Sequence, residues 1–225
     1  MKKVLGILGL GSQSTLYCIK ELNDKFYQLE KGFSTFPFML LNTNFETINP
    51  YLPTNFDALL PPLGCAFQQL QSLDVSHILV PNITVHQALE KLQQCQPILH
   101  PIKLTLQHLK DNDLHEIMIF GTKATMESAY FELYFSKANI KMKRPTEEDI
   151  KFINDLRQRI YFQAETNKDI SEYSGLLEKY TRQHSVVIAC SELSLLKTGK
   201  FNPKVIDMLD LQLEEALALY YKNDF

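Results

Sequence analysis

Residues 76–86 (SHILVPNITVH) and 184–194 (HSVVIACSELS) decide the fold class of this chain. Each stretch begins with a short apolar run rich in β-branched residues, which is typical of a strand buried on both faces, and then turns into small polar residues that open helices. Because ligands of open parallel α/β sheets lie at the carboxyl ends of strands, these turns are candidate ligand sites. The candidates for one shared pocket are Asn82, Thr84, Cys190 and Ser191.

The same alternation of strand and helix patterns continues on both sides of these two stretches. Strands are predicted at 3–9, 36–41, 76–80, 117–121, 140–143 and 186–190, and residues 97–102 form a short strand or an extended linker. Helices are predicted at 14–29, 56–71, 86–95, from 103 onward, and at 126–137, 147–166, 172–184 and 209–221. Ser12 or Ser14 is the expected N-cap of the first helix.

This order of elements predicts an α/β fold with two similar lobes. We expect a parallel sheet in each lobe, a pseudo-twofold relation between the lobes, and the active site in the cleft between them. The N-terminal lobe is predicted to comprise residues 1–102 plus 209–225, and the C-terminal lobe residues 103–208.

Composition and charge narrow the class of protein. The chain has 225 residues, 45% of them hydrophobic and 22% charged, with a net charge of -3, as in ordinary globular proteins. No dense Lys/Arg run is present, so we expect no nucleic-acid partner. The apolar run after Lys3 is interrupted by Gly6 and Gly9, so it predicts neither a signal peptide nor a membrane segment. A cytoplasmic location is the resulting expectation.

The four cysteines show no CxxC pair and no spacing typical of a zinc site, so no metal is expected. Cys18, Cys65 and Cys95 fall within helical patterns and are interpreted as small buried side chains. Only Cys190 stands at a predicted strand end.

Four segments together resemble the aspartate/glutamate (Asp/Glu/hydantoin) racemase family, in particular its aspartate-racemase branch. LGILGLGSQST (residues 5–15) is similar to the family's glycine-rich first loop, although it is one residue shorter and lacks a second glycine directly after Gly9. IFGTKATMESAYF (119–131) follows the Gly-Thr-x-x-Thr-Met element of the family. VVIACSELSLL (186–196) follows its second cysteine motif, and VPNITVH (80–86) follows the first.

The first cysteine motif departs from the family pattern, which runs Cys-Asn-Thr before a His. Aligned on Thr84 and His86, the chain has Asn82 at the position of the first catalytic cysteine and Ile83 at the position of the usual Asn. The second motif is intact in its aspartate-racemase form, with Cys190, then Ser191 in place of the commoner Thr, then Glu192. One thiol of the expected pair remains.

The resemblance implies a cofactor-independent racemase for aspartate or glutamate, and a homodimer. Such an enzyme removes the α-proton from one face of an amino acid and returns a proton to the other. A cysteine thiol titrates near 8.5, and a helix N-terminus lowers that value, so Cys190 is predicted to be the principal acid–base residue, serving the L face in the family pattern. Asn82 does not titrate and acts only by hydrogen bonding to substrate or water.

Further polar residues at strand ends are candidates for holding the substrate and its enolate-like intermediate. These candidates are Ser14, Thr15, Asn42, Thr84, Thr122, Thr125, Ser191 and Glu192. Thr84 and Thr125 are equally suited to capping helices, and Glu192 to the positive end of a helix dipole. His86 is interpreted as a surface or packing residue. A second substrate carboxylate calls for a cation, and the sequence does not choose among Lys123, Arg157 and Arg159.

Two other functions remain open from the sequence. A one-thiol decarboxylase or isomerase of the same superfamily needs only Cys190, because it protonates a planar intermediate on a single face. A pseudoenzyme that binds an amino acid or carboxylate without turnover needs no acid–base group. Activity measurements separate the pseudoenzyme from the two enzymes, and the substrate separates the enzymes from each other.

Overall fold

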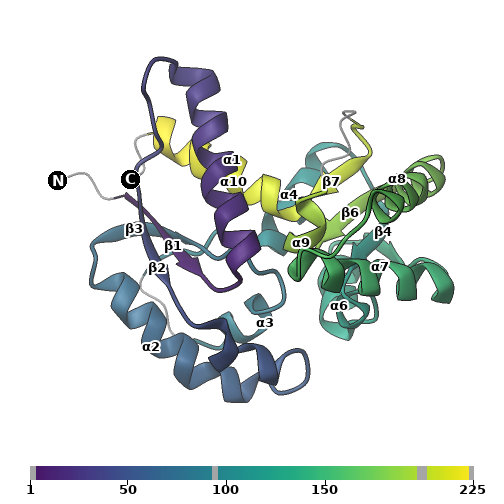
Figure 1. Cartoon of the computed structure of the whole chain (residues 1–225), viewed down its shortest axis with the longest axis horizontal. Helices are drawn as coiled ribbons and strands as arrows, with labels where there is room; N and C mark the ends of the chain where they lie inside the picture. Colours follow the sequence, from purple (N-terminus) through teal and green to yellow (C-terminus); the bar gives the residue numbers. More distant parts are fainter. Residues whose placement is uncertain (1–3, 93–95, 197–201, 223–225) are drawn as a thin grey trace. The chain divides into compact units, whose positions relative to one another are not determined.

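The computed structural model describes residues 4–92, 96–196 and 202–222. The chain divides into two compact units, Met1–His100 with Gln212–Phe225, and Pro101–Leu211. Each unit contains its own parallel sheet with helices around it (Figure 1). The predicted α/β class with two parallel sheets is therefore confirmed.

The first unit is built on a three-stranded sheet in the order β2-β1-β3. Its elements are β1 (Val4–Gly9), α1 (Ser12–Glu30), β2 (Phe38–Asn42), the short 3-10 turns η1 (Phe45–Thr47), η2 (Asn49–Tyr51) and η3 (Asp57–Leu59), α2 (Leu60–Gln71), β3 (Val75–Leu79) and α3 (His86–Leu89). The connection from β1 leads to β2 on one side of β1, and the connection from β2 then crosses β1 to reach β3 on its other side. Right-handed crossovers therefore place α1 and α2 on opposite faces of the sheet, as Figure 1 shows.

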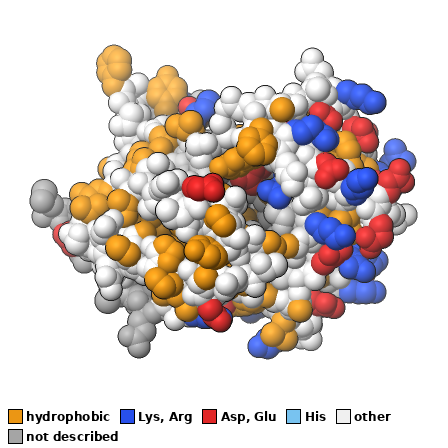
Figure 2. All heavy atoms as spheres, turned by 60° about the horizontal axis from the view of Figure 1, so that its bottom comes forward, with side chains coloured by type: hydrophobic (Ala, Val, Ile, Leu, Met, Phe, Trp, Pro, Cys, Tyr) orange, Lys and Arg blue, Asp and Glu red, His pale blue; other side chains and the backbone are white. Residues whose placement is uncertain are grey.

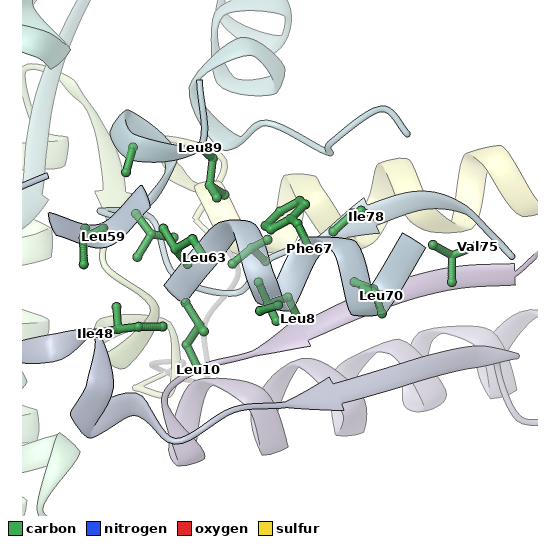
Figure 3. Close-up of a cluster of buried hydrophobic side chains, with 14 residues drawn as sticks. Leu8, Leu10, Ile48, Leu59, Leu63, Phe67, Leu70, Val75, Ile78 and Leu89 are labelled. Atoms are coloured by element: carbon green, nitrogen blue, oxygen red, sulfur yellow. The ribbon is translucent and has the colours of Figure 1, made fainter. Parts of the chain in front are cut away.

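A hydrophobic core joins α2 to its face of the sheet. Phe67 of α2, Leu8 of β1 and Ile78 of β3 belong to one cluster of buried side chains, which Figure 3 shows. The buried positions of α2 recur at helical spacing, at Leu63, Ala66, Phe67 and Leu70. The two prolines of the segment lie in the first turn of α2, where no backbone N–H is needed, so the helix begins there unbroken.

The C-terminal helix α10 (Met208–Tyr221) belongs to the first unit from Gln212 onward. The buried Gln212 side chain donates a hydrogen bond from Nε2 to the main-chain oxygen of Leu99, at 2.6 Å. The Tyr220 ring packs edge-on against Phe26 of α1, with 5.0 Å between ring centroids. These contacts join α10 to the first unit.

The second unit has a four-stranded sheet in the order β5-β4-β6-β7. Its strands are β4 (Glu116–Gly121), β5 (Lys141–Lys143), β6 (Ser185–Ala189) and β7 (Val205–Asp207). As in the first unit, the first strand lies between the second and the third. Strand β7 was not predicted, because three residues are too few to show an alternating or continuous apolar pattern.

The helices of the second unit differ from the prediction in several of their bounds. They are α4 (Pro101–Asp111), α5 (Lys123–Met126), α6 (Ala129–Lys137), α7 (Glu147–Tyr161), α8 (Asn167–Thr181) and α9 (Ser191–Ser194). The helix predicted at 126–137 is interrupted, because Ser128 caps α6 with its side chain. The helix predicted at 147–166 ends at Tyr161, because Thr166 and Asp169 form a capping box that starts α8.

Three expectations for the first unit need correction or lie outside the described residues. The helix predicted at 86–95 ends at Leu89, and Cys95 lies outside the described residues. Of residues 97–102, expected to be a short strand or an extended linker, Ile98 forms one parallel bridge with Ile78, and α4 already begins at Pro101. Cys65 is exposed, because it lies on the outer side of α2, whereas Cys18 is buried as predicted.

The surface carries charges of both signs. Figure 2 shows acidic and basic side chains interspersed over part of the face that is drawn. Ion pairs of the second unit include Lys143 with Glu116 and Lys179 with Asp149, each at 2.6 Å. In the part of the chain that is described, no helix is both long and apolar enough to cross a membrane.

Candidate active site

The candidate residues of the second unit gather where β4 and β6 end. Gly121 and Ala189 are register partners in these neighbouring strands, so the residues that follow them, Thr122 and Cys190, lie side by side at the carboxyl edge of the sheet. A Cβ atom at Gly121 would lie 3.1 Å from the main-chain oxygen of Ala189. Glycine therefore permits the close approach of the two strand ends.

Thr122 and Thr125 form the turn after β4. The Thr122 hydroxyl accepts a hydrogen bond from the Thr125 backbone N–H at 3.0 Å and caps α5. The two hydroxyl oxygens lie 2.9 Å apart, and Thr125 is buried. The capping role that the sequence left open thus falls to Thr122 rather than Thr125.

Cys190 is the N-cap residue of the short helix α9 and is 4% exposed. Its thiol donates a hydrogen bond to the Glu192 carboxylate, with Sγ and Oε2 3.1 Å apart. Burial, and next the negative charge of Glu192, raise the pKa of Cys190 well above its usual value. The expectation of a lowered Cys190 pKa is therefore wrong. The Leu193 N–H at the start of the helix does lower this pKa, but burial and the charge of Glu192 outweigh it.

The half-buried Asp207 lies at the end of β7, the strand that neighbours β6. The Ser194 hydroxyl donates to Oδ1 of Asp207 at 2.9 Å, and the Leu209 N–H donates to the same oxygen at 2.8 Å. Desolvation, and next the charge of Asp210, raise the pKa of Asp207 to about 7. Sequence reasoning missed this carboxyl group, and the only available signal was an acidic residue at the boundary between a short apolar run and the terminal helix.

The structure separates the three cations that the sequence left undecided. Arg159 pairs with Asp169 at 3.0 Å, and Lys123 lies 3.8 Å from Glu127. Arg157 instead interacts electrostatically with Cys190 and acts to lower its pKa. Among the described residues, no acidic group lies within ion-pair distance of Arg157, and its buried Nε has no hydrogen-bond partner. Of these three cations, Arg157 is the one that interacts electrostatically with the thiol.

The candidate residues of the first unit gather where β1 and β2 end. Gly9 and Asn42 are register partners, and the Thr43 backbone N–H donates to the Gly9 oxygen at 2.9 Å. Asn42 is exposed and is the last residue of β2 rather than a loop residue. A Cβ atom at Gly9 would lie 2.6 Å from Oδ1 of Asn42, so the two strand ends are in close contact.

Ser14 and Thr15 are buried in the first turn of α1, and their hydroxyls are engaged locally. The Ser14 hydroxyl donates to the main-chain oxygen of Gly11 at 3.1 Å, and the Thr15 hydroxyl donates to the same oxygen at 2.7 Å. The helix begins at Ser12, and its N-cap is Gly11 without a side-chain hydrogen bond. The expectation that Ser12 or Ser14 caps this helix is therefore wrong.

Asn82 and its neighbours form the turn after β3. The Asn82 side-chain oxygen accepts a hydrogen bond from the Val85 N–H at 3.3 Å, which leaves its NH₂ group as a donor. Its main-chain oxygen lies 2.9 Å from Nδ1 of His86, and because a carbonyl only accepts, this nitrogen carries the proton. Burial lowers the pKa of the fully buried His86 to about 3, so the ring stays neutral and is a packing residue. Thr84 is half-buried.

The chemistry available to the two strand-end groups is different. The second unit offers one thiol with a carboxylate partner, together with hydroxyls and a cation. The thiol is the group that can transfer a proton. The first unit offers an amide and hydroxyls, which only form hydrogen bonds. Within the described residues, no group of three or more His, Cys, Asp or Glu side chains is arranged to hold a metal ion.

Gly9→Ala is expected to lower the free energy of unfolding by about 1–3 kcal/mol, the usual cost of overpacking. The exposed Asn42 side chain has room to rotate away, but the new Cβ would also lie 2.9 Å from Cγ2 of the buried Thr15. Gly64→Ala is the control, because its nearest neighbour would be Leu92 at 3.8 Å and alanine favours helix. Urea denaturation measures both variants, and equal stability of Gly9→Ala and wild type would contradict the close contact.

Comparisons with known proteins agree on one family. Residues 7–216 match the sequence model of the family described as Asp/Glu/Hydantoin racemase. An aspartate racemase homologue from Pyrococcus horikoshii is 20% identical over 98% of this chain and 100% of that chain, with a TM-score of 0.82. The aspartate racemase of Picrophilus torridus is 18% identical over 100% and 99% of the two chains, with a TM-score of 0.78.

A third solved structure is more distant. The glutamate racemase of Francisella tularensis, in complex with D-glutamate, is 12% identical over 99% of this chain and 82% of that chain, with a TM-score of 0.61. At these identities the structural likeness shows a shared fold.

Proposed function

Because this chain belongs to the Asp/Glu/hydantoin racemase family, we propose that it is a cofactor-independent amino-acid racemase acting on aspartate or glutamate, with one thiol as its acid–base group. The observation that carries the proposal is the Cys190 thiol at a strand end, hydrogen-bonded to the Glu192 carboxylate at 3.1 Å. A thiol in this position serves as a general base once it has lost its proton. The carboxylate is the group that accepts that proton.

The proposed reaction begins when the Cys190 thiolate removes the α-proton of an L-amino acid. The C–H bond breaks, its electron pair moves into the carboxylate, and an enolate-like dianion forms. Backbone N–H groups and hydroxyls stabilise that charge, and we assign this role to Ser191, Thr122 and Thr84. Reprotonation by Cys190 regenerates the L-amino acid.

Inversion requires a proton on the opposite face, which the family supplies with its first cysteine. We assign this face to Asn82, whose NH₂ group is free to hold a water molecule, since its side-chain oxygen is engaged by the Val85 N–H. Water is a much weaker acid than a thiol. Proton return on this face is therefore expected to be slow.

The proposed substrate is a dicarboxylic amino acid. The relatives are named for aspartate and glutamate, and one of them was solved with D-glutamate. Asn42, Ser14, Thr15 and Thr125 complete the proposed substrate-binding set. Ser14 and Thr15 donate their hydroxyl protons to Gly11, so they are available to a ligand only as acceptors, for example of its ammonium group.

The proposal is tested by incubating the purified protein in deuterated water with L- and D-aspartate, L- and D-glutamate, and L-alanine as a control. Proton NMR measures loss of the α-proton signal, and chiral chromatography measures inversion. Exchange with aspartate or glutamate, and none with L-alanine, is the expected result. Absence of exchange in all five amino acids would contradict the proposal.

The same experiment addresses a second candidate function, which the amide at position 82 favours. A one-thiol decarboxylase or isomerase would show no exchange with these amino acids but would convert another carboxylate substrate. A protein that binds without turnover would show a raised thermal midpoint with aspartate or glutamate and no exchange.

A further inference from the structure

Tyr173 of α8 packs on one face of the sheet in the second unit, the same face to which Cys190 belongs. Its ring is fully buried against Phe120 of β4, with 6.2 Å between centroids. Phe120, Ile188 and Asp207 are register partners across β4, β6 and β7, so their side chains point to one face of the sheet. Cys190 comes two residues after Ile188, at the end of the same strand, and continues that face.

The Tyr173 hydroxyl is buried and, within the described part of the chain, has no hydrogen-bond partner. A buried hydroxyl without a partner costs free energy, and such groups in native proteins call for a reason. Electrostatic interactions connect this hydroxyl to the Asp207 carboxyl and to the Cys190 thiol. Strand register and ring packing thus place a donor without an acceptor on the same sheet face as a thiol that must become an anion.

Tyr180 on the same helix is a contrasting case, because its hydroxyl has hydrogen-bond partners. Its ring also packs on Phe120, edge-on at 5.6 Å. Its hydroxyl donates to the Asp149 carboxylate at 2.6 Å and accepts from the Thr146 N–H at 3.1 Å. The two tyrosines thus share a helix and a packing partner and differ in the use of the hydroxyl.

The ionised form of Cys190 needs a donor that its neutral form does not need. The neutral thiol donates to Glu192. After the proton has passed to that carboxylate or to water, the sulfur only accepts hydrogen bonds, and an ionised Glu192 repels it. Arg157 attracts the thiolate electrostatically, and the Leu193 N–H supports it.

We propose that Tyr173 is a positioning residue for Cys190, and that its buried hydroxyl donates a hydrogen bond to the thiolate formed when Cys190 loses its proton. The inference rests on the acid–base role proposed above for Cys190. Tyr173 keeps its own proton in this step, since burial raises its pKa well above the usual value. The sulfur gains an acceptor interaction, and no covalent bond to Tyr173 forms or breaks.

The charged and titratable groups around this pair come from four elements. They are Glu192 of α9, Arg157 of α7, and Asp207 and Asp210 at the junction of β7 and α10. Asp207 is the competing acceptor for the Tyr173 hydroxyl, and its Oδ1 already accepts from Ser194 and Leu209. The test must therefore distinguish a hydrogen bond from Tyr173 to the Cys190 thiolate from one to the Asp207 carboxylate.

The test compares Tyr173→Phe with the matched control Tyr180→Phe. The pH dependence of Cys190 alkylation by iodoacetamide, read on its own peptide by mass spectrometry, reports the thiolate population without requiring turnover. In Tyr173→Phe we expect the midpoint to rise by about one pH unit, and alkylation below the midpoint to slow about tenfold. The thermal midpoint should not fall, because the variant removes an unsatisfied hydroxyl.

Tyr180→Phe should leave the Cys190 alkylation midpoint unchanged and lower the thermal midpoint, because it removes a satisfied hydrogen bond. An unchanged alkylation midpoint in Tyr173→Phe would overturn the proposal. A loss of stability in Tyr173→Phe that grows above pH 7 would show that the hydroxyl donates to the Asp207 carboxylate, and this would also overturn the proposal. Failure of Tyr173→Phe to fold would show that the hydroxyl is needed for packing, with the same consequence. A wild-type protein without racemase activity would remove the proposed function and leave this test intact.

Discussion

Cys190→Ser is expected to reduce α-proton exchange with the L-substrate by about 10²–10⁴-fold, the usual contribution of a general base. A serine hydroxyl does not ionise in the working pH range, so it cannot take the α-proton. The fold should survive, because the smaller hydroxyl still has the Glu192 carboxylate as an acceptor at this buried position. The thermal midpoint should therefore stay within about 2–4 °C of wild type, which corresponds to about 1 kcal/mol in a chain of this size.

The other described cysteines are the controls for this experiment. Cys65→Ser should change neither activity nor stability, because Cys65 is exposed. Cys18→Ser should chiefly lower stability, by about 1–3 kcal/mol, because it buries a hydroxyl in an apolar site. Burial alone raises the pKa of Cys18 to about 12, so this thiol stays neutral and has no acid–base role. Full activity in Cys190→Ser would remove Cys190 from the mechanism.

The buried strands were the most predictable part of the fold. The runs that became β1, β3, β4 and β6 are rich in Val, Ile and Leu and end at glycine or small polar residues, so length and composition identify them. The three-residue strand β7 carries no such pattern. Its pairing with β6 depends on tertiary contact, which sequence periodicity does not record.

Helix boundaries were predictable only where a local signal sets them. Thr166 and Asp169 form a capping box that starts α8, and this local signal in the sequence marks a boundary at the end of the range predicted as one helix. The end of α3 at Leu89 has no comparable signal. Boundaries set by the packing of neighbouring elements are not visible in one segment alone.

The motif residues were visible in the sequence, but their electrostatic state was not. The turn into α9 at Cys190 indicated a lowered thiol pKa, whereas burial and the Glu192 carboxylate raise it. Both effects depend on how the strand end is covered. Tyr173 and Asp207 were missed for the same reason, since only the register of β4, β6 and β7 places them on the face that leads to the thiol.

Asn82→Cys is expected to raise the rate of inversion from the D side by about 10²-fold or more, because it supplies the titratable group that the first motif lacks. In the wild type, exchange of the α-proton with retention of the L-configuration should exceed net inversion, since Cys190 is the only proposed thiol and water serves the other face. The equilibrium between the enantiomers cannot change, so the difference must appear in the rates. Deuterium incorporation and chiral chromatography of one reaction mixture give both rates.

Asn82→Ser separates the thiol from the change in side-chain size. Both variants replace the Asn82 oxygen that accepts from the Val85 N–H at 3.3 Å, with a hydroxyl oxygen in Asn82→Ser and a weak sulfur acceptor in Asn82→Cys, so a loss of stability of no more than about 1 kcal/mol is expected in each. Only the cysteine variant has a group that titrates near neutral pH, and so only that variant should gain inversion, with a rate that rises as the new thiol ionises. The contrary result would be comparable rates of inversion from both enantiomers in the wild type, without exchange that retains configuration. It would show that proton transfer on the face of Asn82 is not slow.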